Sequence, residues 1–318
     1  MIFAFVDVIF ADTVFTIKSN SMTTKAKNIF QNPRTDFSFK KIFATEKNKR
    51  YLIAFLNCFI SKYVGEIADL IYLPNEKFGT EFTHKKVVFD IFCTDTQGKN
   101  FLIEMQRAPQ PEFVDRSIVY LSRAVSDSLG RGENYRIVPT YSVNVLDFEL
   151  PTYHGSDDCF QAIFFKDQKN EILTERIGVF YVNLCNFASS QPEVSQEMRT
   201  WLYLLKNMQD MDESDFRRQD GIFRELMEEC RITKLNNMEK ENYEKSIMEY
   251  EDVKAAIAYT KELAEKNAFD KGLEKGMQKG KNEEKLSIVR NMLDKGLDIA
   301  LISEITGLSV SEIRKIKE

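Results

Sequence analysis

The segment VVFDIFCTDTQGKNFLIEMQ, residues 87 to 106, restricts the fold more than any other part of the sequence. Its apolar residues form two runs of strand length separated by a polar turn that contains a glycine, which predicts a hairpin. Asp90 lies in the first predicted strand, and Glu104 and Gln106 lie in the second. Because side chains alternate between the two faces of a strand, Glu104 and Gln106 share one face. Charges in apolar strands need a physical reason.

The length of the turn decides whether the two acids meet. A three- or five-residue loop centred on Gln97 places Asp90 directly opposite Glu104, with the two Cβ atoms about 4.5 to 5.5 Å apart. Gly98 can adopt the positive φ that such a loop requires. Two like charges in this position destabilise a sheet, so the pattern predicts that a positive group lies between them.

A divalent cation is the candidate for that positive group: Mg²⁺ first, with Mn²⁺ or Ca²⁺ as alternatives. Mg²⁺ takes one or two carboxylates, keeps several waters and binds substrate phosphate oxygens. Asp90 and Glu104 are therefore the predicted metal ligands, and Gln106 could hold a water molecule or contact the scissile phosphate. The alternative is an ordinary solvated strand face; the apolar neighbours Val88 and Phe92 argue against it.

The composition argues against several other kinds of site. The five cysteines are scattered and form no C-x-x-C pair, so neither a disulfide framework nor a thiolate zinc site is expected, and the cytosol is the predicted compartment. The two histidines, His84 and His154, are too far apart for a helical zinc-binding pair. The net charge of −5 provides no global positive field, so any contact with nucleic acid must come from local patches.

The main part of the chain alternates between helix and strand. Residues 36–60 predict a helix that faces a core, and residues 111–129 predict a second one behind Pro111. Residues 137–150 and 176–187 predict further strands. After about residue 195 the pattern is helical almost throughout. The apolar stripe expected on the second helix consists of Val114, Ile118, Leu121, Val125 and Leu129.

The first 29 residues are expected to be an extension, disordered or wrongly included. Their apolar run has no basic start, and Asp7 and Asp12 interrupt it, so an export signal is not expected. Met22 opens a polar segment and is a candidate for the true start. No apolar run in the chain reaches the length of about 18 residues that spans a bilayer, so no membrane partner is expected.

Several short segments, taken together in their order and spacing, resemble the PD-(D/E)XK nuclease superfamily. Within it, the sequence is most similar to the Rpn family of recombination-promoting nucleases and the PD-(D/E)XK nuclease family transposases. The resemblance runs from about residue 30 to near the C-terminus. The segments are VVFD and IEMQ of the hairpin, NPRTDFSFKKIF at 32–43, LIAFLN at 52–57, NEKFG at 75–79, YSVNVLDF at 141–148, WLYLLKNM at 201–208 and the Lys-Gly repeat of the tail.

The resemblance implies an α+β fold, in which a restriction-endonuclease-like core of mixed sheet and flanking helices precedes a helical C-terminal tail. It implies a Mg²⁺-dependent DNA endonuclease that acts in recombination or in a mobile element. Asp90 and Glu104 match the metal ligands, and Gln106 stands where the superfamily usually has lysine. Asp36 matches an acid at the start of the first helix and could complete the site; the alternative is a helix N-cap. Asn183 is an amide where related sequences tend to have glutamate.

Two further groups are candidates for DNA contact. Arg116, Tyr120 and Arg123 follow helical spacing and could grip phosphates beside the metal, or they could form a solvated helix face. Near the C-terminus, a glycine turn between two short helices and an S-x-x-E capping box predict a helix-turn-helix-like segment. Its final helix carries Arg314 and Lys315. DNA binding and protein docking remain alternatives for this segment.

The long charged helix before this segment carries a coiled-coil-like stripe that includes Tyr243 and Tyr250, which makes a homodimer through the C-terminal helices a possibility. Two functions are expected: a metal-dependent DNA endonuclease in the cytoplasm, associated with the nucleoid, or a catalytically weak DNA-binding or assembly protein on a nuclease fold. The expected division is an extension at 1–29, a nuclease-like domain at 30–195, a helical extension at 196–238, a charged helix with a Lys-Gly linker at 239–285 and a helix-turn-helix-like segment at 286–318.

Overall fold

The structure is a computed structural model, and it describes residues 28–74, 76–77, 87–110, 112–129, 135–149, 158–188 and 194–317. The chain divides into two compact units, one ending at Val253 and one beginning at Lys254. The predicted division into five segments stays a prediction. Within the described residues, no helix is both long enough and apolar enough to cross a membrane.

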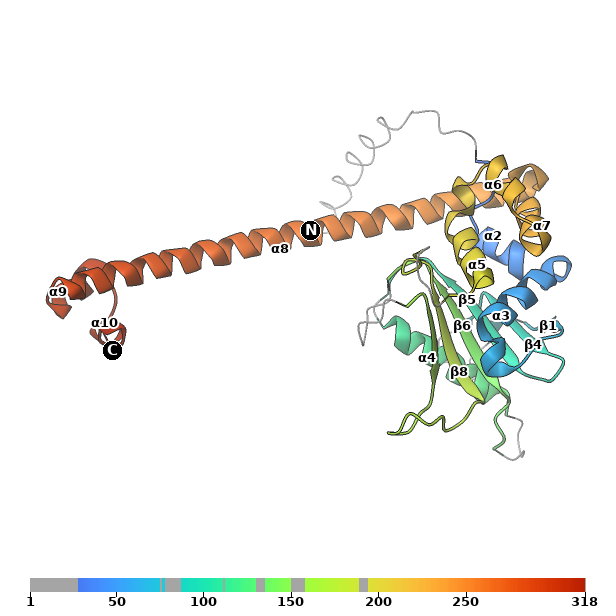
Figure 1. Cartoon of the computed structure of the whole chain (residues 1–318), viewed down its shortest axis with the longest axis horizontal. Coiled ribbons are helices and arrows are strands. Elements are labelled where there is room, and N and C mark those ends of the chain that lie inside the picture. The colour runs from blue at the N-terminus through green and yellow to red at the C-terminus, as the bar shows by residue number, and fades with distance from the viewer. Residues whose placement is uncertain are drawn as a thin grey trace, which may run out of the picture. The chain divides into compact units, whose positions relative to one another are not determined.

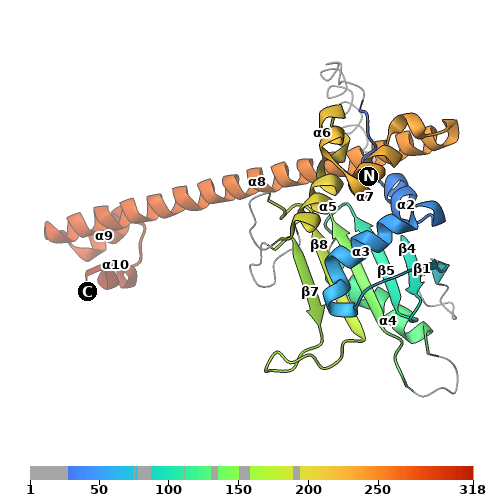
Figure 2. The same cartoon turned by 45° about the vertical axis from the view of Figure 1, so that its right-hand side comes forward.

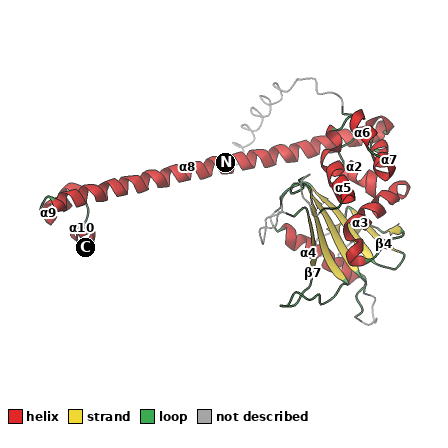
Figure 3. Cartoon of the chain, in the orientation of Figure 1, coloured by secondary structure: helices red, strands yellow, loops and turns green. Residues whose placement is uncertain are grey.

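A mixed six-stranded sheet forms the centre of the first unit, as far as its residues are described (Figures 1 and 3). The spatial order is β1, β4, β5, β6, β8, β7, with parallel pairing of β5 with β6 and of β6 with β8 and antiparallel pairing elsewhere. A separate two-stranded sheet joins β2 to β3. The strands are β1 (Leu70–Tyr72), β2 (Glu76–Lys77), β3 (Val87–Val88), β4 (Ile91–Asp95), β5 (Asn100–Gln106), β6 (Thr140–Leu146), β7 (Phe160–Phe164) and β8 (Ile177–Asn183).

Helices cover both faces of the sheet (Figure 2). On one face lie α2, α3 and α5, and on the other lies α4. The expected helix at 36–60 is two helices, because the chain bends between Phe43 and Lys49. The helices are α2 (Asp36–Phe43), α3 (Lys49–Val64), α4 (Phe113–Asp127), α5 (Gln196–Asn207), α6 (Glu213–Arg218), α7 (Gly221–Glu229), α8 (Asn237–Asp294), α9 (Ile299–Thr306) and α10 (Val310–Lys317), with 3₁₀ turns at Glu46–Asn48, Met208–Asp210 and Ile232–Lys234.

Strand β5 is buried on both faces, because it lies in the middle of the sheet. Phe101, Ile103 and Met105 face the larger core, which is built around the fully buried Trp201. Leu102 faces the smaller core under α4. Polar side chains on this strand therefore enter the interior of the protein, where an unpaired charge is costly.

The β4–β5 hairpin has the predicted register. Ile91 pairs with Ile103 and Thr94 with Asn100; the ladder ends at Ile91, and the same register extended by one step would set residue 90 opposite residue 104. The Asp95 N–H donates to the Lys99 carbonyl at 2.9 Å, which closes a three-residue loop centred on position 97. Gly98 has a φ of +79°, as predicted.

The first predicted strand is not continuous. Val88 belongs to β3 and is 45% exposed, and the chain bends at Phe89 and Asp90 before β4 begins. The expected shared face of Val88, Asp90 and Phe92 is therefore wrong, because the rings of Phe89 and Phe92 both pack into the smaller core, 5.6 Å apart. The bend leaves Asp90 directly before the first residue of β4, outside the strand ladder.

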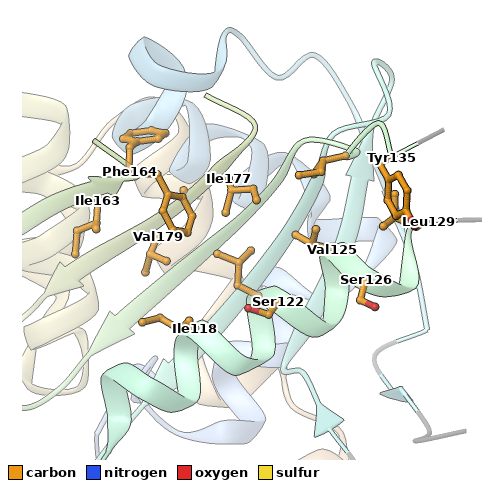
Figure 4. Close-up of a pocket in the computed structure, with 14 residues that line it drawn as sticks. Ile118, Ser122, Val125, Ser126, Leu129, Tyr135, Ile163, Phe164, Ile177 and Val179 are labelled. Atoms are coloured by element: carbon orange, nitrogen blue, oxygen red, sulfur yellow. The ribbon is translucent and has the colours of Figure 1, made fainter. Parts of the chain in front are cut away.

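The expected apolar stripe on α4 is also partly wrong. The buried residues of this helix are Phe113, Ser117, Leu121 and Ala124, whereas Ile118 is 48% exposed. The helix is rotated relative to the prediction because the aromatic Phe113 packs on Phe148 and Tyr181. Ile118 and Val125 line instead an apolar groove of about 560 Å³ between α4 and the end of the sheet that holds β7 and β8 (Figure 4).

The first turns of α8 are part of the first unit. The Tyr243 hydroxyl accepts from the Asn32 N–H at 3.0 Å, and the Tyr250 hydroxyl donates to Asp147 at 2.7 Å. Ser246 lies between them and accepts from the Phe37 N–H at 3.2 Å. Both tyrosines of the expected dimerisation stripe are thus buried against their own chain, and a homodimer through the C-terminal helices stays a prediction.

The second unit has a small core of its own at its C-terminal end. Val289, Ile302 and Ile313 are fully buried against one another, one from each of α8, α9 and α10. The Glu312 N–H donates to the Ser309 hydroxyl at 3.3 Å, and the Ser309 N–H donates to the Glu312 carboxylate at 2.8 Å, which is the predicted capping box.

Candidate active site

The carboxylates of Asp90 and Glu104 are each held by the backbone of the other's segment. The Asp90 N–H donates to Glu104 Oε1 at 3.3 Å, and the Met105 N–H donates to Asp90 Oδ2 at 2.9 Å. The bend at Asp90 makes this possible, since it frees the Asp90 N–H from the sheet ladder. The two predicted acids therefore meet at the point where β4 begins and β5 ends.

Burial shifts the protonation of both acids. Glu104 is 7% exposed, and burial together with the charge of Asp90 raises the pKa of Glu104 to about 8. Burial also raises the pKa of Asp90, although the Met105 N–H and the charge of Lys40 oppose the shift. Without a cation between them, the buried carboxylate of Glu104 and the half-buried carboxylate of Asp90 do not both carry full charge near neutral pH.

Gln106 joins the acid pair to α4. Its Nε2 donates to Glu104 Oε2 at 3.3 Å, and its Oε1 accepts from Arg116 Nη2 at 2.9 Å. Arg116 also donates to Gln110, and its guanidinium lies over the Tyr120 ring, 5.4 Å from the centroid. Three of the predicted site residues, Gln106, Arg116 and Tyr120, are thus in contact, and Gln106 orients Oε2, the second oxygen of Glu104.

Asp36 lies near the pair and is not an N-cap. The cap of α2 is Thr35, whose hydroxyl accepts from the Ser38 N–H at 3.3 Å. Asp36 is the first residue of the helix, and its carboxylate forms an ion pair with Lys40 at 2.8 Å. Lys40 Nζ is also 3.8 Å from Asp90 Oδ1, so this lysine links Asp36 to Asp90.

Lys40 and Arg107 are the residues that the sequence prediction missed. The spacing of four between Asp36 and Lys40 on one helix is a signal for their pairing, but only the resemblance, through Asp36, suggests that this helix lies near Asp90. Arg107 follows Gln106, and its positive charge acts on Asp90. Among the described residues, its buried Nη1 atom has no hydrogen-bond partner.

The remaining predicted residues lie elsewhere. Arg123 is half-buried on α4. Arg314 and Lys315 are exposed on α10, in the second unit. The side-chain Oδ1 of Asn183 accepts from the N–H groups of Cys185 and Asn186 at 2.9 and 3.1 Å, so this side chain caps a turn.

The donor set fits a hard divalent cation. Asp90 and Glu104 each give one oxygen to a backbone N–H, which leaves Oδ1 and Oε2 facing Lys40 and the Gln106 amide. No cluster of three or more His, Cys, Asp or Glu side chains suited to a metal occurs in the part of the chain that is described. Mg²⁺ commonly binds to one or two protein carboxylates, with water and phosphate oxygens in its remaining coordination positions.

The mixed sheet with its flanking helices and the small C-terminal helical core are consistent with a nuclease-type α+β fold followed by a helix-turn-helix domain, and comparison with known families supports this class. The family described as PD-(D/E)XK nuclease family transposase matches residues 33–260. The C-terminal HTH domain of the Rpn/YhgA-like nuclease family matches residues 282–318. The chain therefore belongs to the PD-(D/E)XK nuclease family transposases, which confirms the predicted family and fold class. The searches of curated proteins and of solved structures found no match.

Proposed function

We propose that the protein is a divalent-metal-dependent DNA endonuclease that hydrolyses phosphodiester bonds, with Mg²⁺ as the resident ion and Mn²⁺ or Ca²⁺ as alternatives. Its setting is DNA recombination or a mobile element, and its location is the cytoplasm, at the nucleoid. The observation that carries this proposal is the close pair of Asp90 and Glu104, in which the Asp90 N–H donates to Glu104 and the Met105 N–H donates to Asp90. A close pair of carboxylates that binds no cation would destabilise the fold. Binding of a metal ion gives a reason for two acids to lie together at this point.

Each residue has a defined part in the proposed reaction. Asp90 and Glu104 would hold the ion through Oδ1 and Oε2. The ion, when bound, lowers the pKa of water and offsets negative charge on the phosphate. Gln106 would hold the attacking water or the scissile phosphate. It supplies no charge and accepts no proton at neutral pH.

The chemistry is a simple hydrolysis. The water oxygen forms a bond to phosphorus, the bond from phosphorus to the leaving sugar oxygen breaks, the water proton passes to solvent, and the leaving oxygen takes a proton from solvent. The protein contributes position and charge, which is where most catalysis of phosphoryl transfer originates.

DNA would be held at two places. Arg116 and Arg123 lie on α4, and Tyr120 is half-buried between them; Arg116 would hold backbone phosphates beside the acid pair. Arg314 and Lys315, exposed on the last helix of the helix-turn-helix domain, would contact DNA through that domain.

Cleavage of plasmid DNA by the purified full-length protein tests the proposal. With Mg²⁺ or Mn²⁺ we expect nicked or linear product, and none with EDTA. Asp90→Asn and Glu104→Gln should lose at least about 100-fold in rate. Asp115→Asn removes an exposed carboxylate from the first turn of α4 and should cleave like the wild type. Cleavage that survives both active-site substitutions would refute the assignment.

The second candidate is a catalytically weak DNA-binding or assembly protein. Gln106 favours it, because an amide stands where related nucleases usually have lysine. Absence of cleavage with any of the three metals, together with DNA binding that survives Asp90→Asn, would support this candidate instead.

A further inference from the structure

A lysine of α2, Lys40, lies beside the pair of Asp90 and Glu104. Lys40 Nζ bridges Asp36 at 2.8 Å and Asp90 at 3.8 Å, and its charge acts on both members of the pair, Asp90 and Glu104. The neighbouring Lys41 points elsewhere and pairs with Glu239 on α8. The position of Lys40 is therefore specific, and it does not reflect a generally basic helix.

The other two cations beside the pair are placed differently. Arg116 is held by the side-chain amides of Gln106 and Gln110. Arg107 has a buried Nη1 atom, which limits its reach. The Lys40 side chain is 40% exposed and ends a flexible four-carbon stem, so its ammonium group can move within the site.

The backbone of Lys40 is held in place by the packing of α2, although its side chain is partly exposed. Phe39, Ile42 and Phe43 bury α2 in the main core, and Thr35 caps its first turn. The Phe37 N–H also donates to Ser246 of α8. This packing and capping of α2 hold the Cα atom of Lys40 in place. A side chain that acts in a functional site needs a backbone that is fixed in this way.

We propose that Lys40 supplies the positive charge that Gln106 cannot. In the metal-free protein, the Lys40 ammonium group balances the carboxylates of Asp90 and Asp36. Once the metal binds, the ammonium group moves from Asp90 to the phosphate under attack. The second half of this inference, the movement of Lys40 to phosphate, rests on the proposed nuclease function. The first half, the pairing of Lys40 with Asp90 and Asp36 in the metal-free protein, concerns only this chain's own residues. A metal ion and Lys40 compete for the same oxygen of Asp90, because two positive groups there repel each other.

The first test is binding of Mn²⁺ alone, measured by calorimetry on the full-length protein without DNA. Lys40→Met should bind Mn²⁺ about threefold to tenfold more tightly than the wild type, since the competing charge is gone. Lys47→Met is the matched control, because Lys47 pairs with Glu229 at 2.6 Å on the surface, and its affinity should not change. Weaker or equal binding in Lys40→Met would overturn the first half.

The second test is cleavage of plasmid DNA at saturating Mn²⁺. Lys40→Met should lose about 100-fold in kcat with little change in KM, because the charge acts on the transition state. Lys40→Arg keeps the charge and should recover part of the rate. Wild-type cleavage by Lys40→Met would overturn the second half. If Lys40→Met does not fold, as judged by circular dichroism, Lys40→Gln replaces it in both tests.

The two proposals can fail separately. A wild-type protein that binds Mn²⁺ through Asp90 and Glu104 but cuts no DNA would overturn the nuclease proposal and, with it, the transfer of Lys40 to phosphate. The Mn²⁺ titration of Lys40→Met would still decide whether Lys40 is the counter-ion of the acid pair.

Discussion

Asp90 and Glu104 are bound to each other's segments in both directions: the Asp90 N–H reaches the Glu104 carboxylate, and the Asp90 carboxylate receives the N–H of the residue after Glu104. Each acid is therefore oriented by the position of the other. The arrangement uses backbone donors to hold two side chains that would otherwise repel each other.

The pH dependence of stability should report this pair. The ordinary pKa of Glu104 is 4.5, and its folded value is raised to about 8. The folded protein thus holds this proton more tightly than the unfolded chain, so the contribution of Glu104 to the unfolding free energy is largest below about pH 4.5 and falls as the pH rises toward 8.

Glu104→Gln should remove this slope. In metal-free buffer at pH 8.5 we expect the variant to melt about 4 °C or more above the wild type, with the difference shrinking toward pH 5. Glu66→Gln, at an exposed position, should leave the melting curve unchanged at every pH. Thermal melts from pH 5 to 8.5 check this, and a Glu104→Gln variant less stable than the wild type at pH 8.5 would contradict it.

Docking of α8 on the core should depend on Tyr250. Its hydroxyl donates to the buried carboxylate of Asp147 at 2.7 Å. Tyr250→Phe removes a hydrogen bond to a charged group and should cost about 2 kcal/mol in urea unfolding. Tyr259 lies on the same helix and is 61% exposed, so Tyr259→Phe should change stability by less than about 0.5 kcal/mol. Equal effects of the two substitutions would show that this contact does not hold the helix.

The hairpin turn should be sensitive at Gly98. Its φ of +79° is a left-handed conformation, and no atom lies within 4 Å of where a Cβ would stand, so the effect of a side chain is a backbone effect alone. Gly98→Ala should cost about 1 to 2 kcal/mol. Gly276→Ala, inside α8 and also without neighbours, should instead raise helix content slightly. Chemical denaturation and circular dichroism measure both, and an unaffected Gly98→Ala variant would argue against this turn.

DNA affinity should depend on the last helix. A double substitution of Arg314 and Lys315 by alanine should weaken binding and reduce the slope of log K against log salt by about 2, one for each lost phosphate contact. Lys266→Ala lies outside the helix-turn-helix domain and should leave the slope unchanged. Fluorescence anisotropy at several salt concentrations checks this. An unchanged slope in the double variant would favour protein docking for α10.

The sequence alone determined the local parts of this protein. The alternation of apolar residues and the position of Gly98 defined the register of the hairpin, since pairing across a short loop depends on neighbouring residues only. Capping and glycine signals likewise defined the helices near the C-terminus. These features follow from residues close together in the chain.

Only the tertiary structure decided which distant residues surround the acids. The approach of α2 to β4 brings Lys40 to Asp90, and the rotation of α4 brings Arg116 to Gln106. Both depend on how large apolar side chains fill the two cores, as with Phe113 against Phe148. Packing of this kind involves many residues at once, and so a hydrophobic pattern gives the face of a helix only approximately.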